Sequence, residues 1–186
     1  EWKHGDIVGF VSMICESYEP LANSSGVSLV FDSSVDELEM DFVPDYVQKV
    51  VGNLLSNAIK FSSPASDVLL SVKRERTEVQ ITVQDKGIGI SPEQKEKIFI
   101  PFYQVPGGGG KLGSGIGLSL VKLCVEAMNG WVCVHSVLGE GSVFVVGIPL
   151  VYEGKVNGQI NMAEYDNMPN VEPMEASSRD IHEDVD

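Results

Sequence analysis

The sequence predicts an α+β fold, a two-layer sandwich in which helices cover one face of a mixed or antiparallel sheet. Two observations lead to this fold class. Pairs of short, β-branched segments alternate in polarity as hairpin strands do, and amphipathic helices separate the pairs. The helices and hairpins interleave without the regular strand–helix–strand order of a parallel sheet. The 186 residues are enough for one ordinary domain and a little more.

Residues 1–25 are expected to form the first helix. Asp6 is a plausible N-cap, and apolar residues recur after it at helical spacing until Pro20 perturbs the pattern. Residues 27–31 and 38–42 are then expected to be short strands joined by a polar loop, because both are apolar and β-branched or aromatic.

The clearest helix begins at Pro44. Its apolar residues, from Val47 to Ile59, recur at i, i+3, i+4 and i+7, which forms one continuous stripe. A β-hairpin follows, with strands expected at residues 68–74 and 79–84 because both segments alternate and are rich in valine and isoleucine.

The second half of the chain predicts a short helix starting at Ser91, with proline at its first position. Residues 104–117 are expected to be loop, and a helix is expected at about residues 116–128. A second hairpin is expected from residues 131–136 and 142–149.

Residues 151–186 differ from the rest, because they carry nine acidic side chains against one lysine and one arginine. They hold −7 of the net charge of −14, and we expect an acidic, disordered linker or tail. A nucleic-acid-binding protein needs a basic face, so direct nucleic-acid binding is not expected.

The sequence also predicts a cytoplasmic fragment without membrane contact. No apolar run approaches the roughly 20 residues of a membrane-spanning helix, and no signal peptide is evident. The cysteines Cys15, Cys124 and Cys133 are odd in number, contain no CxxC pair and sit among apolar residues. We therefore expect reduced, structural thiols rather than disulfides.

Three polar patterns point to a ligand. Asn53, Asn57 and Lys60 share a stripe about 60° wide on one helix. Asparagine is a poor helix former, its amide oxygen suits Mg²⁺, and lysine can contact phosphate as a point charge. A solvated helix face is the alternative interpretation of these residues.

The second pattern is Asp85-Lys-Gly87-Ile-Gly89, directly after an expected strand. Glycines permit positive φ and close approach of another group to the backbone. A carboxylate there can accept a hydrogen bond from an exocyclic amine such as that of adenine. A simple strand-to-helix turn would also favour these residues.

The third pattern is a loop with glycines at residues 107–110, 113, 115 and 117, which runs into a helix. Such a loop suits a mobile lid whose backbone, with the helix N-terminus, wraps an anion such as phosphate. Ser114 offers a hydroxyl and Lys111 a positive charge. A flexible surface loop without a ligand is the alternative.

The order of these motifs resembles that of the histidine kinase ATP-binding domain over about residues 5–150. The segments that resemble its N, G1, F and G2 boxes are Asn53-Leu-Leu-Ser-Asn57-Ala-Ile-Lys60-Phe61, Asp85-Lys-Gly87-Ile-Gly89-Ile90, Ile98-Phe99-Ile-Pro-Phe102-Tyr-Gln and Gly113-Ser-Gly115-Ile-Gly117-Leu118. The resemblance implies a Bergerat-type sandwich that binds ATP and Mg²⁺.

The resemblance also implies site roles. Asn57, with Asn53, would hold Mg²⁺, Lys60 would contact phosphate, and Asp85 would recognise the adenine amine while Gly87 and Gly89 admit the ring. The remaining nucleotide-binding residues it implies are Ile90, Phe99, Lys111, Leu112, Gly113, Ser114, Gly115, Ile116, Gly117 and Leu118. Phe102 lies beside the lid in the family pattern, although its residue type alone favours core packing.

Asn53 occupies the position at which gyrase- and chaperone-type ATPases carry a glutamate as general base. An amide cannot accept a proton at neutral pH. Asn53 and Lys60 are therefore expected to serve phosphoryl transfer from ATP to a protein side chain, as in a sensor histidine kinase. The alternatives are a Bergerat-type ATPase and a non-catalytic nucleotide-binding module.

None of the three histidines, His4, His135 and His182, lies in the amphipathic helix expected of a phosphoacceptor. The resemblance therefore implies a histidine-bearing dimerisation domain elsewhere in a homodimeric parent and a response-regulator receiver downstream. A parent anchored in the inner membrane is one alternative that the resemblance leaves open. It divides the chain into the end of a dimerisation region or linker helix (1–25), the ATP-binding domain (26–150) and the acidic linker or tail (151–186).

Overall fold

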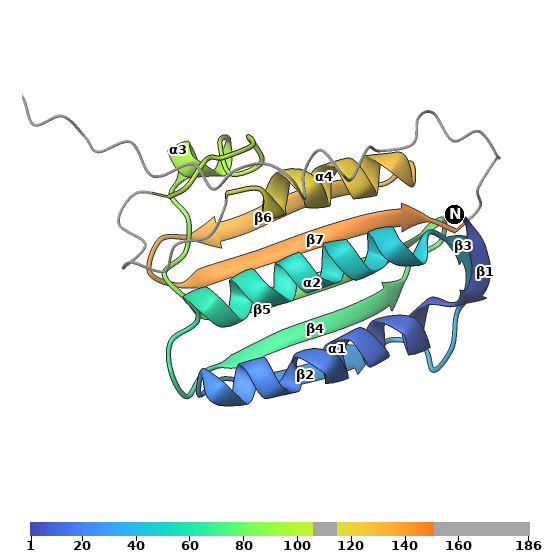
Figure 1. Cartoon of the computed structure of the whole chain (residues 1–186), viewed down its shortest axis with the longest axis horizontal. Coiled ribbons are helices and arrows are strands. Elements are labelled where there is room, and N and C mark those ends of the chain that lie inside the picture. The colour runs from blue at the N-terminus through green and yellow to red at the C-terminus, as the bar shows by residue number, and fades with distance from the viewer. Residues whose placement is uncertain (106–114, 151–186) are drawn as a thin grey trace, which may run out of the picture.

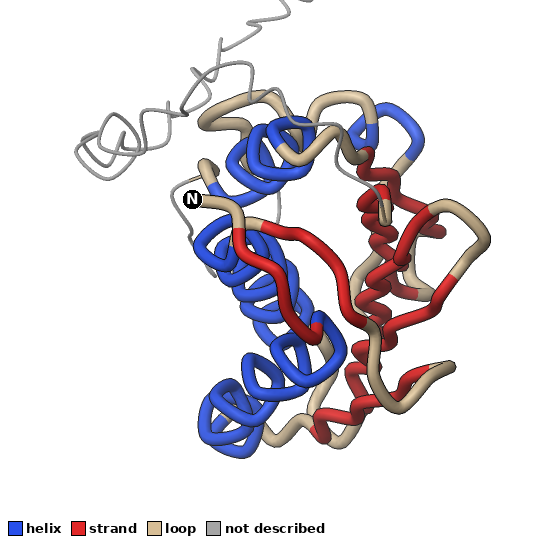
Figure 2. The backbone as a smooth tube through the Cα atoms, turned by 90° about the vertical axis from the view of Figure 1, so that its right-hand side faces the viewer, coloured by secondary structure: helices blue, strands red, loops and turns tan. Residues whose placement is uncertain are grey.

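The computed structural model describes residues 1–105 and 115–150, which form two layers with the main sheet on one side and the long helices on the other (Figure 2). The main sheet has five strands in the order β2-β4-β5-β7-β6. Its strands are β2 (Ser28–Ser33), β4 (Asp67–Arg74), β5 (Glu78–Asp85), β7 (Gly141–Pro149) and β6 (Trp131–Val137). β2 and β4 are parallel and the other neighbours are antiparallel, so the predicted mixed sheet is confirmed.

Three long helices cover one face of this sheet (Figure 1). They are α1 (Ile7–Ser24), α2 (Pro44–Phe61) and α4 (Gly117–Ala127), with α2 between the other two. A short helix, α3 (Pro92–Lys95), begins with the capping box of Ser91 and Gln94. None of the helices in the described part of the chain is both long and apolar enough to cross a membrane.

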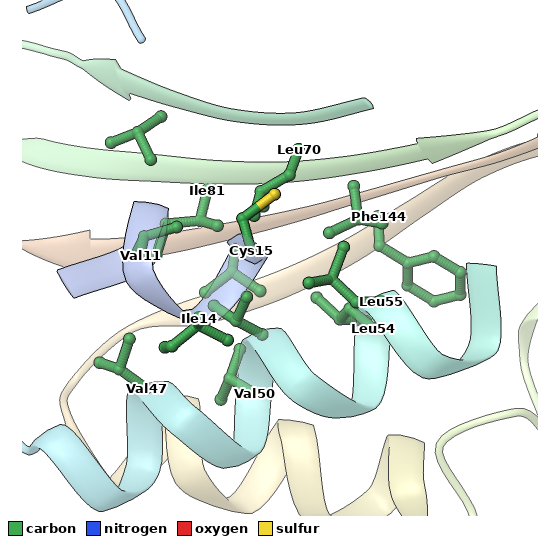
Figure 3. Close-up of a cluster of buried hydrophobic side chains, with 14 of the residues drawn as sticks. Val11, Ile14, Cys15, Val47, Val50, Leu54, Leu55, Leu70, Ile81 and Phe144 are labelled. Atoms are coloured by element: carbon green, nitrogen blue, oxygen red, sulfur yellow. The ribbon is translucent and has the colours of Figure 1, made fainter. Parts of the chain in front are cut away.

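The core lies between the helices and the sheet. Each α2 residue of the predicted stripe is at most 3% exposed. Figure 3 shows Val47, Val50, Leu54 and Leu55 of α2 meeting side chains from α1 and the sheet. The apolar period of the sequence therefore identified the buried face of α2 correctly, and its opposite face is left for polar residues.

The chain begins with a strand, which corrects the prediction of helix throughout residues 1–25. β1 (Lys3–Asp6) pairs antiparallel with β3 (Glu39–Phe42) as a separate two-stranded sheet. Asp6 is the N-cap of α1, as predicted, and its carboxylate accepts hydrogen bonds from the Val8 and Gly9 amides. Pro20 lies inside α1 without ending it.

The two strands expected at residues 27–31 and 38–42 both form, but in different sheets: β2 joins the main sheet beside β4, and β3 pairs with β1. The side chains of Ile7, Val11 and Ile14 on α1 are buried in the common core. α1 is thus an integral part of the helical layer. Its origin in a dimerisation region stays a prediction.

Candidate functional site

Asn53, Asn57 and Lys60 lie half-buried on α2, beside its apolar stripe. The Asn53 amide nitrogen donates to the carbonyl oxygen of Lys49 at 2.7 Å, one turn back on the same helix. This bond leaves the amide oxygen of Asn53 directed at α4, where a Cβ added to Gly117 would lie 2.7 Å from it. The first polar pattern and the glycine-rich segment therefore meet, although they are far apart in the sequence.

Lys60 lies one turn further along α2, with its ammonium 5.3 Å from the centroid of the Phe61 ring. α2 ends at Phe61, and the backbone of its C-cap residue, Ser62, forms an isolated antiparallel bridge with Gly87. The end of α2 is thereby joined to the turn that follows β5. Lys60 thus lies where a positive charge can reach a ligand bound between α2 and that turn.

Asp85 ends β5 and is 7% exposed. One of its carboxylate oxygens accepts a hydrogen bond from the Gly87 amide at 2.9 Å. Burial raises the pKa of Asp85, and hydrogen bonds from the backbone amides of Gly87 and Ser142 oppose that rise. The structure thus has a buried carboxyl held by two backbone amides, which suits recognition of a further hydrogen-bond donor.

The glycines of the second pattern are required by contacts within the protein. A Cβ at Gly87 would lie 2.3 Å from the Phe61 carbonyl oxygen, and a Cβ at Gly89 would lie 2.1 Å from that of Val137. Gly89 also has a φ of +69°, which favours glycine. The close approach that these glycines permit is therefore that of another backbone segment of the same protein. That these glycines also admit an adenine ring stays a prediction.

The N-terminus of α4 lies beside Asn53, and its N-cap residue, Ile116, offers no side-chain cap. An uncapped N-terminus leaves amide donors and the positive end of the helix dipole for an anion. Gly115, with a φ of +71°, precedes it, and its carbonyl oxygen accepts from the Phe102 amide at 3.0 Å. Leu118 is half-buried.

Four predicted site residues, Lys111, Leu112, Gly113 and Ser114, lie outside the described residues.

The two phenylalanines of the third box differ in position. Phe99 is half-buried and packs edge-on against Phe144, with ring centroids 6.4 Å apart. Phe102 is 37% exposed and has a φ of +65°, so the prediction that it packs in the core is wrong. Its backbone lies in the left-handed region, and its amide donates to the Gly115 carbonyl. This turn directs the Phe102 side chain away from the core.

Two hydroxyls for which the sequence predicted no role, those of Ser136 and Ser142, hold the turn after β5. The Ser136 hydroxyl accepts from the Ile90 amide at 2.8 Å and donates to the Gly141 carbonyl at 2.7 Å. It also lies 2.9 Å from the Ser142 hydroxyl. The register of the predicted second hairpin, which places Ser136 opposite Ser142, was the signal that could have indicated them.

The types of side chain near the site limit which metal cation could bind there. In residues 1–105 and 115–150, no group of three or more His, Cys, Asp and Glu side chains is arranged to hold a metal ion. A divalent cation at this site would depend on the amide oxygens of α2 and on ligand oxygens. Mg²⁺ accepts such a shell, because it commonly keeps few protein ligands and completes its coordination with phosphate and water.

Residues 42–152 match the family described as histidine kinase-, DNA gyrase B-, and HSP90-like ATPase. The chain is 36% identical over 140 residues to the circadian input-output histidine kinase CikA of Thermosynechococcus vestitus, covering 73% of this chain and 19% of the relative. It is 31% identical over 152 residues to the sensor histidine kinase RppB of Synechocystis sp., covering 81% and 34%. The chain thus spans between a fifth and about a third of these relatives.

Solved structures share the fold. Full-length ShkA in complex with AMPPNP superposes with a TM-score of 0.73 and 27% identity, covering 83% of this chain and 32% of that protein. The nucleotide-free catalytic domain of the histidine kinase ThkA superposes with a TM-score of 0.72 at 22% identity, covering 82% and 99%. The sequence match extends over more than half of the chain. The protein therefore belongs to the histidine kinase-, DNA gyrase B-, and HSP90-like ATPase family.

Proposed function

We propose that this chain is the ATP-binding catalytic domain of a sensor histidine kinase, which donates the γ-phosphoryl group of ATP to a histidine on a separate dimerisation domain. The observation that carries the proposal is that three distant segments meet at one end of the sandwich. Asn53 of α2 touches Gly117 at the start of α4, and the end of α2 bridges to Gly87 after Asp85. This end offers a buried acceptor, a cation and an uncapped helix N-terminus.

Each group has a role that follows from its chemistry. The Asp85 carboxyl would accept the hydrogen bond of the adenine amine. The amides at the start of α4, with the glycine-rich loop before it, would hold the phosphates, and the Lys60 ammonium would offset their charge. Such a site works chiefly by positioning ATP and by electrostatic stabilisation of the transferring group.

Asn57 and Asn53 are the residues that would hold Mg²⁺ through their amide oxygens. The Asn53 geometry fits this role, because its nitrogen is bonded to the Lys49 carbonyl and its oxygen is turned toward α4. When bound, Mg²⁺ would neutralise part of the charge on the phosphate oxygens. The side chains of α2 would then fix the phosphate chain between α2 and the N-terminus of α4.

Asn53 also supports transfer to a protein over hydrolysis, because its amide cannot act as a general base toward water. The acceptor is expected outside this chain. His4 is hydrogen-bonded to Asp41 at 2.8 Å within the β1–β3 sheet, and His135 lies on β6. The proposed partners are a histidine-bearing dimerisation domain of a homodimeric parent and a receiver domain, in the cytoplasm. Residues 1–25 and 151–186 would connect to them.

The test is calorimetric titration of the 186-residue chain with ATP, with and without Mg²⁺. We expect Mg²⁺-dependent binding that Asp85→Asn and Asn57→Asp abolish or weaken at least about tenfold, since the first replaces an acceptor oxygen of a buried carboxyl with a donor and the second adds a negative charge where the phosphates would lie. Asp32→Asn, an exposed change on β2, is the matched control and should bind as the wild type does. Absence of binding by the wild type would refute the site.

Phosphoryl transfer is tested with γ-labelled ATP and the dimerisation domain of the parent. We expect label on a histidine of that domain and none on this chain. Steady release of phosphate by the chain alone, lost in Asn57→Asp, would indicate a hydrolysing ATPase instead.

A further inference from the structure

Three polar side chains form a row across the sheet at the edge of the proposed nucleotide site. Asp85 on β5 is paired with Ser142 on β7, and Ser142 is paired with Ser136 on β6. Directly paired residues in antiparallel strands carry their side chains on the same face, about 5 Å apart. Asp85 and Ser142 are buried, at 7% and 5% exposure, and Ser136 is half-buried.

The hydrogen bonds of Ser136 determine where the hydroxyl protons of Ser136 and Ser142 point. A hydroxyl carries one proton and can accept two hydrogen bonds. The Ser136 proton goes to the Gly141 carbonyl at 2.7 Å, and its oxygen accepts from the Ile90 amide at 2.8 Å. In the remaining contact, at 2.9 Å, Ser136 has no proton left to give. Ser142 must therefore be the donor in that contact.

Because Ser142 donates to Ser136, its hydroxyl can act only as an acceptor toward Asp85 and toward a ligand. With its proton committed to Ser136, the Ser142 hydroxyl offers only lone pairs on its other side. The Asp85 carboxylate is also an acceptor. A base with an amine at its six-position can donate to such an acceptor-only pair. A base with a carbonyl at that position has only its ring N1–H to donate, and its carbonyl oxygen meets the lone pairs of Ser142 with no proton between them, which is costly.

We infer that Ser136, which none of the predicted motifs includes, is a positioning residue that determines base specificity: by accepting the Ser142 proton it makes this end of the site select 6-amino over 6-oxo purine nucleotides. The inference rests on the proposed function, because it assumes that a nucleotide base lies against Asp85. Ser136 acts through Ser142 and the Ile90 amide and does not itself touch the base. Removing its hydroxyl frees the Ser142 proton to turn and donate to a carbonyl.

The experiment compares Mg²⁺-ATP with Mg²⁺-ITP, whose base has a carbonyl in place of the amine. Dissociation constants are measured by calorimetry for the full 186-residue chain and for Ser136→Ala, Ser136→Thr and the control Ser71→Ala, which lies on β4. We expect wild type and Ser71→Ala to prefer ATP strongly. Ser136→Ala should lower the ratio of ITP to ATP dissociation constants by about three- to tenfold, the usual range for one hydrogen bond. Ser136→Thr, which keeps the hydroxyl, should restore the ratio.

The outcomes separate this inference from the proposed function and from a purely structural role. If Ser136→Ala weakens both nucleotides by the same factor, Ser136 only supports the fold and the inference is wrong. A wild type that binds ATP and ITP equally also overturns it, while leaving ATP binding intact. A wild type that binds neither refutes the proposed function itself. If Ser136→Ala does not fold, Ser136→Cys is measured instead, because its sulfur is only a weak acceptor. The quantity compared is again the ratio of the ITP to ATP dissociation constants.

Discussion

Replacing Gly89 with alanine is expected to destabilise the domain considerably more than replacing Gly139 with alanine. Both glycines have left-handed backbones, with φ of +69° and +86°. Alanine in that conformation costs about 1–2 kcal/mol at either position. The surroundings differ, because a Cβ at Gly139 would meet nothing within 4 Å, whereas a Cβ at Gly89 would lie 2.1 Å from the Val137 carbonyl oxygen. The pair therefore separates backbone strain from a steric clash.

The clash cannot be relieved by rotating a side chain, since the atom in contact belongs to the backbone at the end of β6. Backbone shifts forced by overpacking cost about 1–3 kcal/mol. Gly89→Ala should then lose about 2–5 kcal/mol of unfolding free energy, and Gly139→Ala about 1–2 kcal/mol. Urea denaturation, followed by tryptophan fluorescence and compared at equal m-values, measures both. Equal losses would show that Gly89 is not held against Val137 as described.

Three further predictions follow from the surroundings of single residues. Burial raises the pKa of both Cys15 and Cys124 to about 11, so a thiol reagent at pH about 8 should label Cys133 first; a rapid phase that persists in Cys133→Ser would contradict this. Burial raises the pKa of Asp85 above its ordinary 3.8, so the folded state binds the Asp85 proton more tightly than the unfolded state does. Ionisation of Asp85 therefore costs stability as the pH rises from 3.8 to the raised pKa. Urea denaturation should show the stability of Asp85→Asn relative to wild type increasing from pH about 3.8 upward and then levelling off; a decrease would refute the raised pKa. Gly147→Ala should displace the Trp131 ring, 2.4 Å from the added Cβ, and break its 2.8 Å bond to Glu78, shifting the indole emission; an unchanged spectrum would contradict the contact.

The sequence predicted the local elements well, because their signals are local. The stripe of α2, the Asp6 cap and the Ser91 start of α3 each depend on residues within a few turns, and all three are confirmed. β1 was missed because its four residues have no alternating pattern and become a strand only by pairing with β3, more than thirty residues later. Non-local pairing of that kind leaves no periodicity in the segment itself.

The polar groups of the site were predictable by residue type, but the reasons for some of them were not. The Asp85 turn was expected to need glycines so that another group could approach, and in the structure that group is the backbone of Phe61 and Val137. Phe102 was misplaced because its left-handed φ is set by the turn with Gly115, which its residue type does not indicate. Ser136 was missed because its role arises only from the hairpin register.

These contacts make the base end of the proposed site a preformed structure. Gly87 lies against Phe61, Gly89 against Val137, and Gly141 against the Asp85 carbonyl, where a Cβ would be 2.1 Å away. Substitutions at these glycines must alter the fold and any bound ligand together, so they cannot distinguish recognition from stability. The Ser136 hydroxyl is different, because its removal creates no clash, although it leaves the Ile90 amide and the Gly141 carbonyl without this partner. A general loss of stability weakens both nucleotides alike, so the ratio of ITP to ATP dissociation constants should still report base selection at Ser136.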